Sequence, residues 1–229
     1  MNLHALRRDA AHWGWIPALL SRALRRLQVW AGVHVFRVNV RPLPRQLIEV
    51  DPPDGITVRV LRIEQLLEAS VDPELDLDPE FIRITLAQGD LVCGAYEDGR
   101  LVGYAWRTSI AAPYYNGLWI KPGHRYHYAY RTYVLPSHRG RQIHAAIVRL
   151  ADKRSLERGC AAEIDLMPID NLASLGAARS LGRMKVGYAG YLRMFGHSFP
   201  FRTPRVKEMG VVIFKPRARI PIGLVPARS

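Results

Sequence analysis

VLPSHRGRQIHAAI, residues 134–147, joins a short apolar run to a helix-like stretch through a basic turn. Backbone N–H groups without partners and the positive end of the helix dipole meet where such a helix begins. Arg139 and Arg141 add fixed positive charge, and arginine can bind phosphate oxygens through two parallel hydrogen bonds. The turn therefore indicates either a site for an anionic, phosphate-bearing ligand or an ordinary basic helix start.

The elements around this turn alternate in type. Two apolar runs joined by Asp98-Gly99 predict a β-hairpin, and a further strand, from Arg125 to Leu135, leads into the turn. Helix, strand, helix and two strands are expected after it, which predicts an α/β protein with a mixed sheet and helices on its faces. The expected strands are 33–40, 56–61, 91–96, 101–109, 125–135, 161–167, 186–195 and 209–214, and the expected helices are 63–69, 139–158 and 171–181.

The N-terminal segment differs from the rest of the chain. Apolar residues recur at three- and four-residue intervals from Ile16 to Trp30, with arginines between them, which predicts an amphipathic helix with a basic face. This helix can pack on the protein's own core or lie on an anionic membrane. Four prolines between Pro42 and Pro53 suggest a linker. We therefore expect an N-terminal helical appendage over 1–50 and one larger domain over 51–229.

The composition limits the partners. The net charge of +13 comes mostly from arginine and favours polyanions. The arginines are scattered and are not gathered with aromatic residues into a recognised module, which disfavours nucleic acid. Cys93 and Cys160 form no metal-ligand pattern, so no metal site is expected and a reducing, cytoplasmic location is favoured. No apolar stretch reaches the roughly 20 residues that span a bilayer.

Two separated motifs carry a resemblance to a known family. The first is Val134-Leu135-Pro136 followed by Arg139-Gly140-Arg141-Gln142-Ile143-His144, and the second is Asn171-Leu172-Ala173-Ser174 followed by Leu181-Gly182. Over roughly residues 56–214 the chain resembles the GNAT superfamily of acyl-CoA-dependent N-acyltransferases. The resemblance implies a mostly antiparallel central sheet with two splayed strands and flanking helices, and a bacterial-like N-acetyltransferase.

The resemblance also implies a cofactor site for acetyl-CoA or another acyl-CoA. The pantetheine arm is expected along the backbone of Tyr133, Val134 and Leu135, and Asn171 is expected to contact the cofactor. The pyrophosphate is expected on the N–H groups of the turn, that is, Arg139, Gly140, Arg141, Gln142, Ile143 and His144. Gln142 and His144 stand where the family has glycine. If both adopt ordinary helical angles, their side chains can point away from the phosphates.

The resemblance implies direct attack of a neutral amine on the thioester. In place of the family's usual glutamate base, this chain offers His127 on the strand before the turn and Asp165 on the strand after it. The tyrosine that often protonates the thiolate falls at Ala178, so Tyr188 is expected to replace it, with Tyr191 as an alternative.

The acceptor is a small-molecule or peptide amine that the motifs do not identify. An acidic run in a basic protein (Asp72, Glu74, Asp76, Asp78 and Glu80) either attracts a cationic amine or forms a solvated loop. Two other functions remain open. One is a catalytically degenerate binding module. The other is an acyltransferase at the inner face of the membrane, contacting anionic lipid through residues 16–30 and using a longer acyl chain from CoA or acyl carrier protein. A homodimer also remains open.

Overall fold

The computed structural model describes residues 7, 10–11, 14–44, 51–114, 117–180 and 182–216. Leu181 of the second motif, and Trp13 before the N-terminal helix, lie outside these residues. Contacts divide the chain into two compact units. The first unit comprises Met1–Arg41 and Asp165–Ile213, and the second comprises Pro42–Ile164 and Phe214–Ser229. The domain boundary near residue 50 stays a prediction.

The second unit contains a sheet with the strand order β8-β7-β4-β3-β2. The β2–β3, β3–β4 and β4–β7 pairs are antiparallel, whereas β7 and β8 are parallel. The predicted mixed α/β sheet is therefore confirmed. Its strands are β2 (Ile56–Val60), β3 (Leu91–Glu97), β4 (Arg100–Thr108), β7 (Tyr126–Val134) and β8 (Ala162–Pro168), of which β8 continues into the first unit; β5 (Ala112–Pro113) pairs with β6 (Trp119–Lys121).

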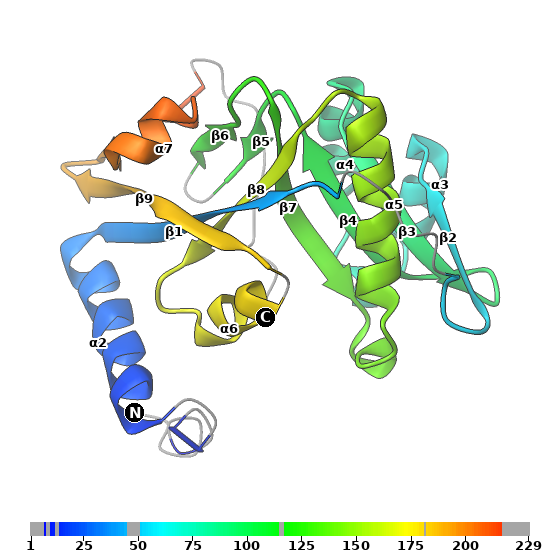
Figure 1. The fold of residues 1–229 in the computed structure, drawn as a ribbon, viewed down its shortest axis with the longest axis horizontal. Coiled ribbons are helices and arrows are strands. Elements are labelled where there is room, and N and C mark those ends of the chain that lie inside the picture. Colours follow the sequence, from blue (N-terminus) through cyan, green and yellow to red (C-terminus); the bar gives the residue numbers. More distant parts are fainter. Residues whose placement is uncertain are drawn as a thin grey trace. The chain divides into compact units, whose positions relative to one another are not determined.

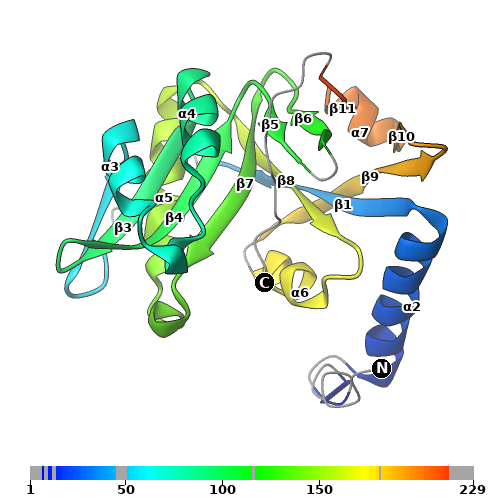
Figure 2. The ribbon, with the colours of Figure 1, turned by 180° about the vertical axis from the view of Figure 1, so that it is seen from behind.

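Helices cover both faces of this sheet. Helix α5 (Ile143–Glu157) crosses β2, β3 and β4 on one face (Figure 1). Helices α3 (Ile63–Ala69) and α4 (Pro79–Ala87) lie on the other face, which Figure 2 shows from behind. Between α4 and the sheet, the ring of Phe81 packs edge-on against Trp106 at 5.0 Å. Both rings are buried, and this burial of aromatic surface anchors α4 to β4.

The hairpin between β3 and β4 confirms the Asp-Gly prediction. Glu97 pairs with Arg100, which leaves the two-residue loop Asp98-Gly99 between them. Both loop residues have positive φ, 48° and 80°, as a type I′ turn requires.

The first unit contains the strand order β8-β1-β9-β10. Strand β1 (Val33–Pro42) pairs antiparallel with β9 (Met184–Met194), so the strand expected in the appendage belongs to a sheet. No strand was expected between residues 195 and 209, yet β10 (His197–Arg202) forms a hairpin with β9. The remaining elements are α2 (Trp15–Ala31), α6 (Leu172–Ser180), α7 (Pro204–Glu208), β11 (Val212–Phe214) and the short helices η1 (Pro73–Leu75) and η3 (Pro136–His138).

The N-terminal helix is confirmed as α2, and its polar side faces the rest of the first unit. Ser21 donates to the backbone carbonyl of Asp170, and Arg25 donates to the Asp170 carboxylate. Trp15, Ile16 and Leu20 are exposed instead. The helix is therefore held by polar contacts and does not bury these apolar residues in the protein's own core.

Two further features concern the cysteines and the helices. Cys93 and Cys160 are free and buried, where a thiol packs as a small apolar side chain. Among the helices that the structure describes, none is long and apolar enough to cross a membrane.

Candidate functional site

The basic turn lies in the second unit between the end of β7 and the start of α5. The helix was expected to begin at Arg139, but it begins at Ile143. Two residues before it are left-handed: Gly140 has φ 81° and Gln142 has φ 58°. These angles open the chain into a loop, with η3 at its start. No side chain caps α5 at Gln142, so the turn presents an uncapped helix N-terminus, where the first N–H groups lack intrahelical partners.

The two residues at the family's glycine positions behave differently. His144 lies within α5 and has the helical conformation that was expected. Gln142 does not, because the N-cap position of this turn is left-handed. The left-handed conformation is about 1–2 kcal/mol less stable for a residue with a Cβ, whereas glycine adopts it without this cost. The condition of helical angles at both Gln142 and His144 is met by His144 but not by Gln142.

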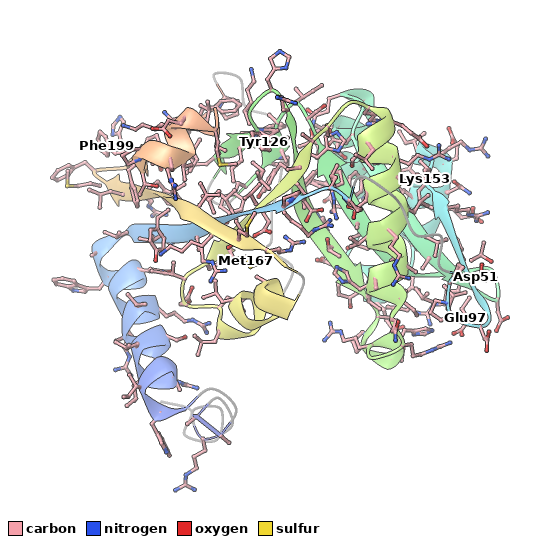
Figure 3. All side chains as sticks on the ribbon, in the orientation of Figure 1. Asp51, Glu97, Tyr126, Lys153, Met167 and Phe199 are labelled. Carbon is pink, nitrogen blue, oxygen red and sulfur yellow. The ribbon has the colours of Figure 1, made fainter. Side chains whose placement is uncertain are left out.

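Arg141 and His138, both in this turn, bind one carboxylate. Glu97, at the end of β3 and labelled in Figure 3, accepts from both the Nη1 and the Nη2 of Arg141. His138 Nε2 lies 2.8 Å from Glu97 Oε2. The hydrogen bond from Arg141 is the main cause that lowers the pKa of Glu97 to about 2. The fork of Arg141 thus already has an internal anionic partner, which the sequence spacing of 44 residues could not indicate.

Before the turn, successive residues point their backbone N–H and C=O groups to opposite edges of the strand. The N–H of Leu135 donates to the carbonyl of Val102, and its carbonyl accepts from the N–H of His138. Tyr133 and Val134 are half-buried, opposite Tyr104 and Gly103 of β4. Because neighbouring strand residues direct their backbone groups to opposite edges, Val134 directs its own away from β4. Its carbonyl accepts from Arg139 Nε at 3.2 Å.

Strands β7 and β8 are paired over a short length. Their parallel register covers Tyr126↔Ala162, His127↔Glu163 and Tyr128↔Ile164. β7 continues to Val134 and β8 to Pro168 beyond this register. The backbone groups of Val134 therefore point to the edge of β7 that pairs with β8 at residues 126–128.

A β-bulge lies in the middle of β7. Ala105 pairs with Thr132 and Trp106 pairs with Tyr130, so Arg131 is the extra residue, with φ 46°. The bulge turns the side chain of Arg131 toward α4. Its guanidinium lies 4.5 Å from the ring centre of Phe81. Bulges are frequent beside active sites, where they redirect side chains.

The acidic run before α4 is largely engaged within the second unit. Asp72 and Glu74 bind Arg100, and Asp78 caps α4 by accepting from the N–H of Phe81. Asp76 lies 3.6 Å from Arg131 Nη2 and also accepts from it through the backbone carbonyl. These contacts favour a structural role for the acidic run over a role in attracting a cationic amine.

His127 is buried beneath α5. Its Nδ1 lies 2.7 Å from Ser155 Oγ, and Ser155 in turn donates to the carbonyl of Ala151. The Ser155 oxygen therefore accepts from Nδ1–H, which leaves Nε2 as the acceptor nitrogen. Burial is the main cause that lowers the pKa of His127 to about 4. The neutral ring suits a proton acceptor, but its exposure of 1% leaves little access for an amine.

The other sequence-predicted residues lie in the first unit. Asn171 caps α6 by accepting from the N–H of Ser174 at 3.0 Å. Asp165 accepts from Asn39 at 2.7 Å and from Arg183. Tyr188 is partly exposed, with Lys185 Nζ 4.4 Å from its ring centre. Asn171 and Asp165 thus have structural partners, while Tyr188 retains exposed surface.

A second buried titratable group was missed from the sequence. The Asp90 carboxylate accepts from the hydroxyl of Tyr130 and from Gln88 Nε2 at 3.1 Å. Burial is the main cause that raises the pKa of Asp90 to about 6. No local pattern marks Asp90, because its partner Tyr130 comes from β7, 40 residues along the chain. Within the described part of the chain, no group of three or more His, Cys, Asp or Glu is arranged to hold a metal ion.

Asp90 and His127 predict opposing effects of pH on stability. The pKa of Asp90 is raised from 3.8 to about 6, so its favourable contribution is present below pH 3.8 and is lost as the pH rises through 6. The pKa of His127 is lowered from 6.5 to about 4, so its contribution is present above pH 6.5 and is lost as the pH falls through 4. Each amounts to at most about 3–3.5 kcal/mol.

We therefore expect these two effects to offset each other between pH 4 and 6. Asp90→Asn should make the free energy of unfolding fall as the pH drops through this range, and His127→Phe should make it rise. Urea titrations of the two variants at several pH values measure this difference. Parallel pH profiles for both variants and the unmodified protein contradict it.

Comparisons with known proteins indicate a family and a fold for this chain. The model of the "Acetyltransferase (GNAT) family" matches residues 58–182. A GCN5-related N-acetyltransferase from Sphaerobacter thermophilus has a TM-score of 0.51 and 16% sequence identity over 73% of this chain, which spans 54% of that protein. The aminoglycoside N-acetyltransferase AAC(6')-Iy, solved in complex with CoA, has a TM-score of 0.46 and 18% identity over 58% of this chain and 91% of that one. AAC(6')-Ih from Acinetobacter baumannii has a TM-score of 0.44 and 19% identity over 56% and 90%.

At 16% identity, the structure from Sphaerobacter thermophilus shows a shared fold and no more. No curated protein matches the chain significantly.

Proposed function

This chain belongs to the GNAT family of acetyltransferases, and from that membership we propose that it transfers an acetyl group from acetyl-CoA to a primary amine by direct attack. The acceptor is a small-molecule or peptide amine. The observation that carries the proposal is the turn after β7. It contains Arg139 and leads into the uncapped N-terminus of α5.

The turn fits a pyrophosphate in three respects. Gly140 and Gln142 open the loop through left-handed angles, the first N–H groups of α5 lack helix partners, and Arg139 and Arg141 are exposed at its rim. We propose that the N–H groups of residues 139–144 bind the pyrophosphate. When bound, acetyl-CoA supplies the thioester that an amine attacks.

The strand before the turn supports a place for the pantetheine arm. Of the three residues expected there, Leu135 has both backbone groups engaged within the second unit. Val134 directs its groups toward the other edge of β7. We therefore propose pairing chiefly through Val134, with Tyr133 alongside it. Asn171 keeps its proposed cofactor contact, in addition to its capping of α6.

The proton acceptor and donor are proposals on individual residues. His127 has a neutral ring and Asp165 a carboxylate, and each is bound to structural partners. Tyr188 is the more exposed candidate for protonating the thiolate. Asp90 joins this set through its raised pKa and its contact with Tyr130, next to the bulge. A pH–rate profile of His127→Phe, Asp165→Asn, Tyr188→Phe and Asp90→Asn assigns the roles, since only loss of a reacting group removes a limb of the profile.

The experiment that tests the function combines calorimetry with thiol release. We expect acetyl-CoA to bind, and free thiol to form with at least one member of a panel of primary amines. Arg139→Ala with Arg141→Ala should weaken binding roughly tenfold or more, because charge-assisted hydrogen bonds contribute about 1.5–3 kcal/mol each. Arg149→Ala, which removes an exposed arginine from the body of α5, is the matched control. Gln142→Gly should retain the turn and bind acetyl-CoA at least as tightly.

The same experiment separates the other functions. Binding without thiol release from any amine supports a degenerate binding module. Release only with long-chain acyl-CoA or acyl carrier protein supports an acyltransferase for longer chains. Equal binding by the double variant and the control contradicts the proposed pyrophosphate turn.

A further inference from the structure

Helix α2 directs its polar side toward the protein. Ser21 Oγ donates to the Asp170 carbonyl at 2.7 Å, and Arg25 Nε donates to the Asp170 carboxylate at 2.9 Å. Ala18, on the same side, is 1% exposed. These contacts all lie within the first unit, so they fix which side of α2 is covered there.

The opposite side of α2 is mostly apolar and is open to solvent, and the exposed Arg26 also lies on it. At 3.6 residues per turn, its exposed large apolar residues fall within a sector of roughly 140°. Amphipathic helices of soluble proteins normally bury this side. Here the exposed fractions are 57% for Trp15, 73% for Ile16, 52% for Leu19, 58% for Leu20 and 87% for Trp30.

A second exposed apolar segment belongs to the same unit. The β9–β10 hairpin carries Met194 and Phe195 at its tip and Phe199 on β10, which Figure 3 labels. Phe195 is 88% exposed and has φ 50°. The N–H of Arg193 donates to the carbonyl of Gly32, the residue that follows α2, at 2.7 Å. The C-terminal end of α2 and the hairpin are therefore neighbours.

The positive charge of the chain is concentrated in this unit. Its residues include 14 Lys or Arg against 4 Asp or Glu, a net charge of +10 out of the +13 of the whole chain. Two of the four acids, Asp165 and Asp170, are bound to Arg183 and Arg25. The exposed apolar residues thus belong to a unit with a large excess of cations.

We propose that the apolar side of α2 and the β9–β10 hairpin form one surface that binds an anionic lipid bilayer. Aliphatic and aromatic side chains can enter the boundary between headgroups and acyl chains, where tryptophan is favoured. The arginines and lysines of the unit are attracted to anionic headgroups. The aliphatic residues on α2 favour lipid over nucleic acid, which binds aromatic and basic groups.

The test uses the full-length protein and sedimentation with vesicles of phosphatidylcholine, with or without phosphatidylglycerol. We expect binding to the anionic vesicles, a blue shift of tryptophan fluorescence, and weaker binding at high salt. Leu19→Glu with Leu20→Glu, and separately Phe195→Ser, should each reduce the bound fraction by about tenfold at limiting lipid. The matched control is Val71→Ser, since Val71 is 84% exposed in the second unit. Circular dichroism checks that each variant is folded.

Thiol release with acetyl-CoA and a soluble amine is measured in parallel. Because the surface does not depend on the proposed acyl transfer, vesicle binding is expected even if no amine is acetylated. Absence of binding to anionic vesicles overturns the proposal, as does equal loss in the Val71→Ser control. If light scattering shows a dimer that Leu19→Glu with Leu20→Glu dissociates, while vesicles remain unbound, the surface joins two copies of the chain and the membrane proposal is wrong.

Discussion

Replacing Glu163 with alanine is expected to lower the free energy of unfolding by about 3–5 kcal/mol. Glu163 Oε2 lies 2.6 Å from Arg107 Nη2, and both side chains are only 1% exposed. Removing the carboxylate leaves a buried guanidinium without its counter-charge, which is more costly than losing the attraction itself. At about 2–4 °C per kcal/mol for a chain of this size, the melting temperature should fall by roughly 6–20 °C.

The control for Glu163→Ala is a double variant, Arg107→Met with Glu163→Leu. It removes both charges and keeps much of the volume, so its stability should remain close to that of the unmodified protein. Thermal unfolding followed by circular dichroism compares the two. If the single variant is no less stable than the double variant, the interpretation of this ion pair is wrong.

The second large effect is expected in the first unit, for Gly190→Ala. Gly190 lies in β9 between β1 and β10. A Cβ at this position overlaps the backbone carbonyl oxygen of His34 and lies 2.7 Å from Cζ of Phe201. The backbone atom cannot rotate away as a flexible side chain can. We expect a loss of about 3 kcal/mol, at the upper end of the cost of overpacking.

Gly159→Ala separates this steric cost from the cost of backbone conformation. Gly159 has φ 79°, and no heavy atom lies within 4 Å of the position that a Cβ would take, so its replacement should cost only about 1 kcal/mol. Urea unfolding of both variants gives the comparison. Similar losses for the two glycines are inconsistent with a close contact at Gly190.

Local patterns explain why much of the fold could be predicted. Asp98-Gly99 adopts the positive φ angles that its composition favours, and the strand, turn and helix around Arg139 follow one another in the chain. The bulge at Arg131 has no such signal, because it depends on how β7 pairs with β4. The pKa values of Asp90 and His127 likewise depend on burial against other elements. The turn was found from the sequence, whereas the ionisation of these two groups required the structure.

Helix α2 illustrates a limit of periodicity. The spacing of Leu19, Leu20 and Trp30 predicted a helix with an apolar side, and that helix is present. Periodicity does not say which side contacts the protein. Asp170, roughly 150 residues along the chain, decides this by binding Ser21 and Arg25.

The contact between Glu97 and Arg141 would make binding of the proposed pyrophosphate at the turn an exchange reaction. An arriving phosphate meets a guanidinium that already has a carboxylate partner, and His138 shares that partner. For Arg141 to bind the phosphate through its full fork, one anion must replace another, so fewer solution ions are released than at a bare arginine. The affinity of the turn for the proposed pyrophosphate should thus be set partly at the end of β3, and it should vary with salt less steeply than the number of positive charges implies.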